Sequence, residues 1–313
     1  MTSAMLTTPS VTVRAPAKVN LELCVGPVRS DGFHPLATIY QAVSLYDEVT
    51  VQSAQEWGIQ IQGSRAHGLS ADESNLAMRA ARALAARHGV DEPVQILLEK
   101  EIPVAGGMAG GSSDAAATLV ACDWMWGLGL SKDDLGEVAA ELGSDIPFLL
   151  HGGTAIGTGR GELITPVLTR GTFPWVLAAA DSGLSTPDVY RRFDAIAERE
   201  GREVPPPTSS MELMAALRSG DPEGLAAHLR NDLQQAAIEL RPELGDVIEA
   251  GLHFGALAGI VSGSGPTVAF LVADTESAID LSIALAATRT VSETFRATGP
   301  VHGATVRGVP RVD

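Results

Sequence analysis

The chain has 313 residues, of which 45% are hydrophobic and 19% charged; this composition excludes a disordered chain, and the length suits two domains. Lys and Arg number 22 against 38 Asp and Glu, and the resulting formal net charge of −16 excludes an overall basic field for nucleic acid. No run approaches about 18 apolar residues, so the sequence predicts no segment that spans a membrane.

The N-terminal segment is predicted to have a frayed end followed by strand structure. The first ten residues, MTSAMLTTPS, lack the basic start and continuous apolar stretch of a signal peptide, so we expect a frayed terminus. Residues 11–25 alternate in a β-rich pattern that Pro16 interrupts. The pattern predicts two strand pieces joined by a bend that carries Lys18 and Asn20.

The rest of the first half alternates strands with helices. In chain order the patterns predict a loop at 28–36, strands at 37–54, 58–63 and 94–103, helices at 72–90, 112–126 and 131–143, and strands and turns over 144–167. Ser74 or Asn75 can cap the first helix, and a capping box begins the third at Ser131. We expect Trp124 and Trp126 of the second helix to lie in the core.

The pattern of strands and helices stops at 169–173 and begins again after it. This break predicts two domains, 1–170 and 171–313. The second half then predicts a strand at 175–183, helices at 185–200, 210–218, 222–230 and 243–253, a strand–turn–strand unit at 259–274 and a closing helix at 276–291. Patterning alone therefore favours a two-domain protein of mixed α and β structure.

The chain has two cysteines, Cys24 and Cys122, both in apolar surroundings and without a partner pattern. Its seven histidines show no paired ligand spacing. These features indicate a reducing compartment and a cytoplasmic protein, and they predict no cysteine- or histidine-based metal site.

The segment PVAGGMAGGSSDAAATL, residues 103–119, is the most informative stretch of the chain. A strand, a glycine-rich loop, two serines and a helix in this order are typical of a phosphate site. The first helical N–H groups have no internal partner, and glycines let backbone amides converge on oxygens. Asp114 fits this arrangement as an ordinary acidic residue of the first turn. The simpler interpretation is a tight loop that only connects strand to helix.

Two familiar nucleotide motifs are absent. The sequence contains no G-x-x-x-x-G-K-[ST], which excludes a Walker A loop, and the glycine segment does not fit a strict G-x-G-x-x-G with a following acidic residue. A dinucleotide-binding dehydrogenase is therefore a distant alternative.

Three segments together resemble the motifs of the GHMP small-molecule kinases, in the right order and spacing: APAKVNLEL (15–23), PVAGGMAGGSSDAAATL (103–119) and GIVSGSGPTVAFL (259–271). The family loop usually reads Gly-Leu-Gly-Gly-Gly-Ser-Ser, whereas Met108 and Ala109 stand at its second and third places here. Ala109 adds a methyl group that narrows the loop without abolishing phosphate binding.

The resemblance implies an α+β fold of two domains: an N-terminal nucleotide-binding domain, a C-terminal α/β sandwich and an active site in the cleft between them. It implies ATP and Mg²⁺ as cofactors, and Lys18 and Asp145 as the catalytic pair. The carboxylate of Asp145 would accept the proton of the acceptor hydroxyl beside the Lys18 ammonium. The residues expected to bind ATP are Asn75, Pro103, Val104, Ala105, Gly106, Gly107, Met108, Ala109, Gly110, Gly111, Ser112 and Ser113. An N-cap is the alternative role for Asn75.

Two further stretches, 29–49 and 141–162, resemble the branch of this family that phosphorylates a cytidine diphosphate-linked polyol. A flat pyrimidine is held by stacking and edge hydrogen bonds, which Phe33 and His34 can supply. The full set of predicted acceptor-binding residues is Asn20, Phe33, His34, Tyr190, Gly263, Ser264 and Gly265. Tyr190 can also be an ordinary core aromatic on its helix.

Two other functions fit parts of the sequence. One is a GHMP kinase of the homoserine or mevalonate type, which would give the Asp-Gly-Phe-His loop no role, and the other is a ligand sensor that kept the fold and lost the chemistry. The expected partners are ATP and a cytidine diphosphate-linked polyol, with no nucleic acid or membrane. The chain is expected to be a monomer or a homodimer.

Overall fold

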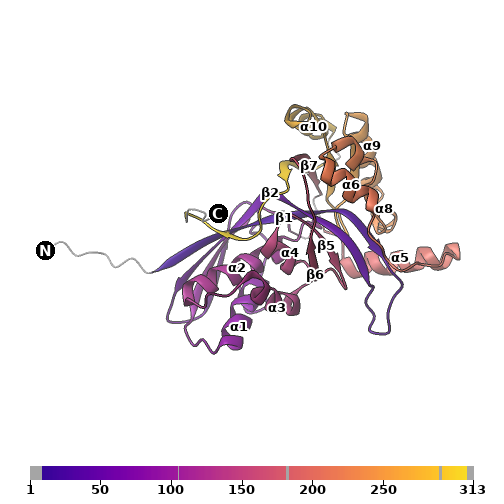
Figure 1. Ribbon diagram of the computed structural model, residues 1–313. Coiled ribbons are helices and arrows are strands. Elements are labelled where there is room, and N and C mark those ends of the chain that lie inside the picture. The colour runs from indigo at the N-terminus through magenta and orange to yellow at the C-terminus, as the bar shows by residue number, and fades with distance from the viewer. Residues whose placement is uncertain (1–8, 105, 181–182, 289–290, 309–313) are drawn as a thin grey trace.

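The computed structural model describes residues 9–104, 106–180, 183–288 and 291–308, which form two β-sheets with helices packed around them (Figure 1). Of the predicted frayed end, residues 1–10, residues 1–8 lie outside the described residues, and a strand already begins at Ser10. Among the described residues, no helix has the length and apolar character needed to cross a bilayer.

The first sheet is built on two long antiparallel strands, β1 and β2, which pair along almost their whole length. Within the described chain it has eight strands: β1 (Ser10–Val25), β2 (Leu36–Ser53), β3 (Gly58–Gln62), β4 (Val94–Glu99), β5 (Thr154–Thr158), β6 (Leu163–Pro166), β8 (Arg230–Asn231) and β12 (Thr305–Val306). The order β12-β1-β2-β4-β3 forms the main path, and β5 adds to β2.

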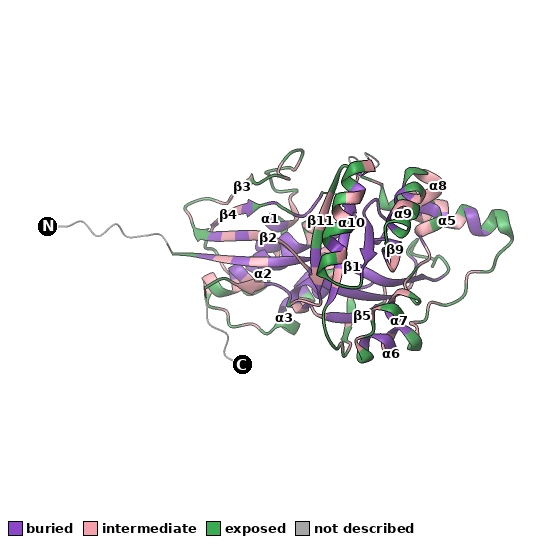
Figure 2. Cartoon of the chain, turned by 90° about the horizontal axis from the view of Figure 1, so that it is seen from above, coloured by how far each residue is buried: buried purple, intermediate pink, exposed green. Residues whose placement is uncertain are grey.

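Four helices of the first half pack beside this sheet: α1 (Leu76–His88), α2 (Gly110–Trp126), α3 (Lys132–Leu142) and α4 (Ile146–His151). Helix α2 contacts both β1 and β2, and its buried face is rich in alanine, which allows close helix–sheet packing. Figure 2 shows the buried residues concentrated where these helices meet the strands.

The second sheet has four antiparallel strands in the order β11-β7-β10-β9. They are β7 (Phe173–Ala179), β9 (Ala258–Val261), β10 (Val268–Leu271) and β11 (Glu293–Gly299). The helices of this half are α5 (Thr186–Glu200), α6 (Met211–Ser219), α7 (Pro222–Ala226), α8 (Gln234–Leu240), α9 (Glu243–His253) and α10 (Thr275–Thr288).

The two sheets share one hydrophobic cluster, to which β1 contributes Val19 and β7 contributes Trp175. The Trp175 indole N–H donates a 3.0 Å hydrogen bond to Oε1 of Gln41 on β2, and both side chains are fully buried. The sheets are therefore joined by apolar packing and by a polar contact that water cannot replace.

The chain also crosses between its two halves through backbone pairing. Strands β8 and β12, which come late in the sequence, both pair with β1. A division into 1–170 and 171–313 remains a prediction, with β12 as a segment of the second half that returns to the first sheet.

Two secondary-structure predictions in the first half of the chain were wrong. Residues 11–25 are one continuous strand, because the irregularity at Pro16 is absorbed by register shifts at Pro16/Ala17 and at Asn20/Glu22. Residues 146–151, predicted as strand and turn, form the short helix α4, which has Pro147 in its first turn.

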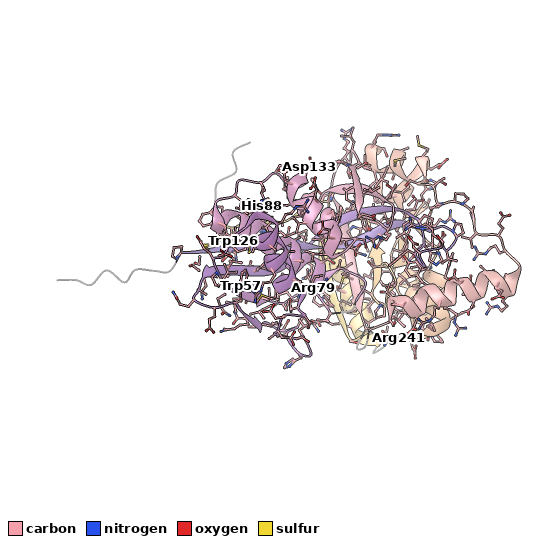
Figure 3. All side chains as sticks on the ribbon, turned by 90° about the horizontal axis from the view of Figure 1, so that it is seen from below. Trp57, Arg79, His88, Trp126, Asp133 and Arg241 are labelled. Carbon is pink, nitrogen blue, oxygen red and sulfur yellow. The ribbon has the colours of Figure 1, made fainter. Side chains whose placement is uncertain are left out.

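The predicted caps at Asn75 and Ser131 are confirmed, but the predicted burial of Trp124 was wrong. Ser131 and Asp134 form a capping box, and Asn75 caps α1. Trp126 packs against the core beside Trp57, with ring centroids 6.3 Å apart (Figure 3). Trp124 is 52% exposed instead of buried, because it lies on the outer face of α2.

Replacing Trp175→Phe should destabilise the protein by about 2–4 kcal/mol, because it leaves the buried Gln41 oxygen unpaired and removes core volume. Urea denaturation followed by circular dichroism measures this change. Trp124→Phe is the matched control and should change stability by less than about 0.5 kcal/mol. Equal losses in the two variants would contradict the bridging role of Trp175.

Candidate active site

A cavity of about 910 Å³ gathers segments that are far apart in the sequence. Its walls come from β1, β2, the start of α2, the α3–α4 junction, α5 and the turn after β9. The predicted site residues that line it are Lys18, Asn20, Phe33, His34, Gly106, Gly107, Ala109, Gly110, Gly111, Ser112, Asp145, Tyr190, Gly263, Ser264 and Gly265.

The glycine loop is held by hydrogen bonds from the other half of the chain. The Ser262 hydroxyl donates to the Gly107 carbonyl at 3.0 Å, and the Thr267 amide donates to the Gly106 carbonyl at 3.3 Å. Gly107 has a positive φ of 75°, and a Cβ there would collide with the Ser262 carbonyl oxygen. This glycine is therefore required by a backbone–backbone contact.

Helix α2 begins with free amides that face the cavity. Its N-cap, Ala109, is the one non-glycine residue of the described chain with a positive φ, 61°, and no side chain caps the helix there. The first bond within the helix runs from the Ser113 amide to the Ala109 carbonyl. The amides of Gly110, Gly111 and Ser112 precede it, so helix geometry leaves them available to an anion.

Several residues predicted to bind ATP do not line the cavity. Met108 is fully buried in the cluster between the sheets, and Pro103 and Val104 lie before the turn of the loop. The Ser113 hydroxyl donates to the Pro16 carbonyl at 2.7 Å, which ties α2 to β1. Ala105 lies outside the described residues.

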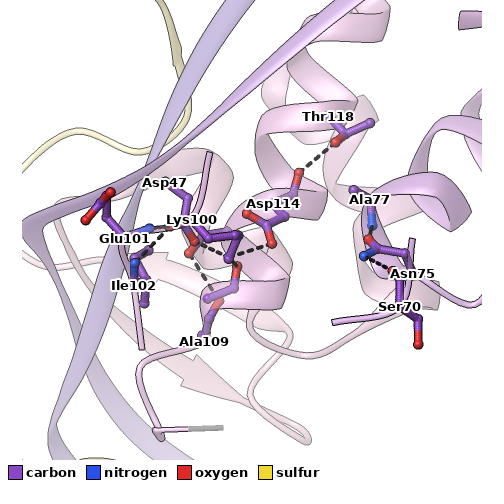
Figure 4. Close-up of polar contacts among 12 residues, drawn as sticks. Asp47, Ser70, Asn75, Ala77, Lys100, Glu101, Ile102, Ala109, Asp114 and Thr118 are labelled. Carbon is purple, nitrogen blue, oxygen red and sulfur yellow. Dashed lines mark hydrogen bonds and ion pairs between the residues drawn. The ribbon is translucent and has the colours of Figure 1, made fainter. Parts of the chain in front are cut away.

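Asn75 is placed as a helix cap, the alternative role considered from the sequence. Its carbonyl oxygen accepts from the Ala77 amide at 3.0 Å, and its amide nitrogen donates to the Ser70 carbonyl at 2.9 Å (Figure 4). The following residue, Leu76, lines the cavity instead. Both ends of the Asn75 side chain are thus engaged in local structure.

Lys18 and Asp145 face each other across the cavity, with Nζ 3.7 Å from Oδ2. The Lys18 ammonium is almost fully buried and donates to Asn20 Oδ1 at 2.7 Å, and Asn20 in turn donates to Thr38 Oγ1 at 2.8 Å. Lys18 therefore has a fixed position, and its charge has a carboxylate partner.

Asp145 is oriented by a residue that the sequence did not single out. The hydroxyl of Tyr40 on β2 donates to Asp145 Oδ1 at 3.0 Å, and the Tyr40 ring stacks on Phe148 with centroids 4.8 Å apart. Burial, followed by the charge of Asp145, raises the pKa of Tyr40 well above its ordinary value. Tyr40 therefore stays protonated and acts as a donor.

One wall of the cavity is aromatic. The rings of His34 and Tyr190 lie 5.2 Å apart at 34°, and the guanidinium of Arg160 lies 5.2 Å from the centre of the Phe33 ring. Phe33 is 51% exposed, so most of its ring is open to a ligand, whereas His34 is buried. A flat heterocycle matches such a wall.

The 263–265 turn also lines the cavity. The Asn231 side chain donates to the carbonyls of Val261 at 2.7 Å and of Gly263 at 2.8 Å, and the Ser264 hydroxyl lies 2.8 Å from that of Thr186 on α5. The turn is therefore held in place on both of its sides.

Sequence reasoning missed several polar residues of the cavity, among them Tyr40, Arg160, Arg191 and Asp194. From sequence, a tyrosine in a strand is expected to lie in the core. Acidic and basic residues on a helix such as α5 are expected to lie on a face exposed to solvent. Tyr40 and Arg160 had a signal, because they lie within the 29–49 and 141–162 stretches that resemble the family.

A buried charge cluster lies beneath the glycine loop (Figure 4). The Lys100 ammonium pairs with Asp47, with Asp114 Oδ2 at 2.6 Å and with the Gly110 carbonyl at 3.4 Å. Asp47 also accepts from the Glu101 and Ile102 amides, at 2.7 and 2.9 Å. The prediction of Asp114 as an ordinary first-turn acid was wrong, because its carboxylate points into the protein.

Burial raises the pKa of the Asp114 carboxyl to about 8; Lys100 opposes the rise and Asp47 adds to it. Although burial lowers the pKa of Lys100, the two carboxylates raise it above its ordinary value. One ammonium therefore faces two carboxyls, and Asp114 Oδ1 has no partner in the structure. The cluster fixes the end of β4 to the first turn of α2.

A divalent metal would find few protein ligands here. Among the described residues, no group of three or more His, Cys, Asp or Glu side chains is arranged to hold a metal ion. The Ser112 hydroxyl and the Asp145 carboxylate do line the cavity. This set fits Mg²⁺ bound mainly by the phosphates of a nucleotide, since Mg²⁺ commonly keeps only one or two protein ligands.

The family described as "GHMP kinases N terminal domain" matches residues 75–153, and "GHMP kinases C terminal" matches residues 213–288. The chain is 52% identical over 312 residues to the 4-diphosphocytidyl-2-C-methyl-D-erythritol kinase of Clavibacter michiganensis, which covers 98% of this chain and 99% of that one. It is 54% identical over 297 residues to the enzyme of the same name from Streptomyces avermitilis, with 95% and 99% covered.

Solved structures agree on the fold. A crystal structure of a 4-(cytidine 5'-diphospho)-2C-methyl-D-erythritol kinase superposes with a TM-score of 0.75 at 32% identity, over 92% of this chain and 98% of that one. A homoserine kinase from Cytophaga hutchinsonii superposes with a TM-score of 0.73 at 20% identity, over 98% and 99%, which shows the fold alone. The predicted two-domain fold is confirmed.

Asp114→Asn should change how stability depends on pH. The folded-state pKa of Asp114 is about 8, above the unfolded value of about 3.9. The free energy of unfolding of the wild-type protein therefore falls as pH rises between these two values. The neutral amide avoids this loss, so the stability of the variant relative to wild type should rise from pH 5 to about 8 and then level off. Urea denaturation at several pH values measures the difference.

Asp91→Asn, at an exposed position before β4, serves as the control and should give a pH profile parallel to that of the wild type. A parallel profile for Asp114→Asn as well would show that Asp114 is ionised in the folded protein at neutral pH.

Proposed function

We infer the function of this chain from the family to which it belongs, the GHMP kinases, and within them the 4-diphosphocytidyl-2-C-methyl-D-erythritol kinases. It transfers the γ-phosphate of ATP to the 2-hydroxyl of 4-diphosphocytidyl-2-C-methyl-D-erythritol, a step in the non-mevalonate route to isoprenoid precursors. The identity of more than half of all residues to enzymes of this name, over nearly the whole chain, carries this conclusion.

The homoserine and mevalonate kinases among the solved structures are less than 25% identical to this chain and share only its fold. A ligand sensor without activity is disfavoured by Lys18 and Asp145, because the two side chains are both present and face each other at 3.7 Å. The cytoplasmic location and the monomeric or dimeric state stay predictions.

The triphosphate of ATP binds at the start of α2. The amides of Gly110, Gly111 and Ser112 point toward its oxygens, and the positive end of the helix dipole adds to the attraction. The net charge of −16 makes such local donors necessary, because the protein as a whole repels anions. Ser112 and Asp145 would hold Mg²⁺, which would offset the negative charge of the phosphates.

Asp145 accepts the proton of the acceptor hydroxyl as the oxygen attacks the γ-phosphorus, and ADP leaves. Tyr40 occupies one carboxylate oxygen and thereby directs the other, Oδ2, toward Lys18 and the cavity. The Lys18 ammonium pairs with the carboxylate and stabilises negative charge that develops on the transferred group.

The cytidine end of the acceptor binds at the aromatic wall. Phe33 and Tyr190 offer faces for stacking, and His34 offers an edge contact. Asn20 and the 263–265 turn line the same cavity next to Lys18, where they can contact the linker to the polyol. The cavity volume of about 910 Å³ is large enough for two small-molecule substrates.

The purified chain, given ATP, Mg²⁺ and 4-diphosphocytidyl-2-C-methyl-D-erythritol, should form ADP, and Asp145→Asn should lower kcat by about 10²–10⁴ while ATP still binds. A coupled ADP assay and calorimetry measure the two effects, and Asp91→Asn is the control. Phosphorylation of mevalonate or homoserine in place of the cytidylyl acceptor would overturn the function. Unchanged turnover in Asp145→Asn would remove Asp145 from its role.

Gly111→Ala tests the phosphate position. No atom lies within 4 Å of a Cβ built at Gly111, so folding should be unaffected, but the added methyl group should weaken ATP binding about tenfold or more. The control is Gly136→Ala in α3, which also meets no neighbour and should leave ATP affinity unchanged. Titration calorimetry with thermal melts distinguishes binding from stability; equal ATP affinity in the two variants would place the phosphates elsewhere.

A further inference from the structure

Lys100 is a buried cation outside the catalytic pair. It follows β4, its side chain is fully buried, and its ammonium faces the carboxyls of Asp47 and Asp114. Replacing a buried ionic cluster by apolar residues of similar volume often leaves stability unchanged or raises it. This cluster also contains one carboxyl more than its single ammonium can pair with. Stability alone therefore gives no reason for a lysine at this position.

The surrounding backbone fixes the position of the ammonium. Asp47 Oδ1 accepts from the amides of Glu101 and Ile102 at 2.7 and 2.9 Å, which hold this carboxylate in one orientation. Its other oxygen, Oδ2, binds Lys100, and Asp114 Oδ2 binds the same ammonium from α2 at 2.6 Å. The ammonium is thus held between the end of β4 and the first turn of α2.

The third group that Lys100 reaches is the carbonyl of Gly110. Nζ lies 3.4 Å from this oxygen, and a Cβ built at Gly110 would lie 3.5 Å from Nζ. Gly110 is the first residue of α2 and lines the cavity, whereas Lys100 does not. The contact therefore joins the buried cluster to the wall of the cavity.

The Gly110 carbonyl belongs to the same peptide unit as the Gly111 amide. A trans peptide is planar, and its C=O and N–H point in opposite directions. An ammonium at the carbonyl oxygen and an anion at the amide hydrogen therefore favour the same orientation of this peptide dipole. The Gly111 amide precedes the first bond within α2, so it is one of the donors that the helix leaves for a ligand.

We propose that Lys100 is a positioning residue for the phosphates of ATP: its buried ammonium holds the Gly110–Gly111 peptide with the Gly111 N–H directed into the cavity. The proposal rests on the proposed function, which places the triphosphate at the start of α2. Lys100 acts through one peptide unit, and Asp47 and Asp114 keep its charge in place.

The affinity for ATP, measured by titration calorimetry, tests this role. Lys100→Met is made in a chain that also carries Asp114→Asn, so that only Asp47, which keeps its two backbone amides, loses the ammonium. This chain should bind ATP about tenfold more weakly than Asp114→Asn alone, which retains Lys100 beside Gly110. Lys100→Gln in the same chain keeps a donor for Asp47 but no charge, and it should show the same loss.

Lys132→Met is the matched control. The Lys132 ammonium also donates to a backbone carbonyl, that of Leu150 at 2.6 Å, but Lys132 does not line the cavity and contacts no part of the glycine loop. Its replacement should leave ATP affinity unchanged. Circular dichroism verifies that each variant is folded.

A second measurement separates positioning from a general loss of structure. Gly111→Ala should weaken ATP binding about tenfold in the Asp114→Asn chain. It should weaken binding by less than about threefold when Lys100→Met is also present, because both changes act on the same amide.

Full ATP affinity in the Lys100 variants, an equal loss in Lys132→Met, or additive losses with Gly111→Ala would overturn the role of Lys100. Turnover of the cytidylyl acceptor by the wild type is measured separately. A wild type that binds ATP and phosphorylates the acceptor, while the Lys100 variants keep full affinity, refutes the role of Lys100 alone. A wild type that binds no ATP refutes the proposed function.

Discussion

The contact between the glycine loop and the turn after β9 is the constraint on which the site depends. Ser262 and Thr267 donate to the carbonyls of Gly107 and Gly106, and the Lys18 amide donates to the Met108 carbonyl at 3.2 Å. The loop is thus fixed to both sheets through its carbonyls. Its amide side, and the first turn of α2, are left free for an anion, and Lys18 is held next to them.

The charges beneath the loop show how the fold and the site are coupled. Lys100 binds two carboxyl groups and a loop carbonyl in a region closed to water, where an unpaired charge is costly. Lys100, Asp47 and Asp114 do not line the cavity, but they connect β2, the end of β4 and the start of α2, whose Gly110 does line it. The cluster therefore supports the same amides that we propose bind the phosphates.

The catalytic pair and the aromatic wall of the cavity rely on different kinds of interaction. Around Lys18 and Asp145, hydrogen bonds hold a charged pair in place. Each of the two side chains still has polar atoms that can contact a substrate. At the aromatic wall, ring faces and a half-exposed carboxylate offer contact area and a polar edge instead. The pair thus suits a reaction that develops charge, and the wall suits recognition of a flat base.

The sequence by itself determined the glycine loop, its helix, the caps at Asn75 and Ser131, and, through resemblance, the kinase fold and the pair Lys18 and Asp145. These features are local, because glycine positions, caps and motifs depend on residues only a few places apart. Tertiary structure alone decided that Asp114 is buried against Lys100, that Tyr40 orients Asp145 and that Asp194 faces His34. Each of these contacts joins residues more than ten places apart. Sequence periodicity describes only local structure, so it cannot predict contacts that arise when separate elements pack together.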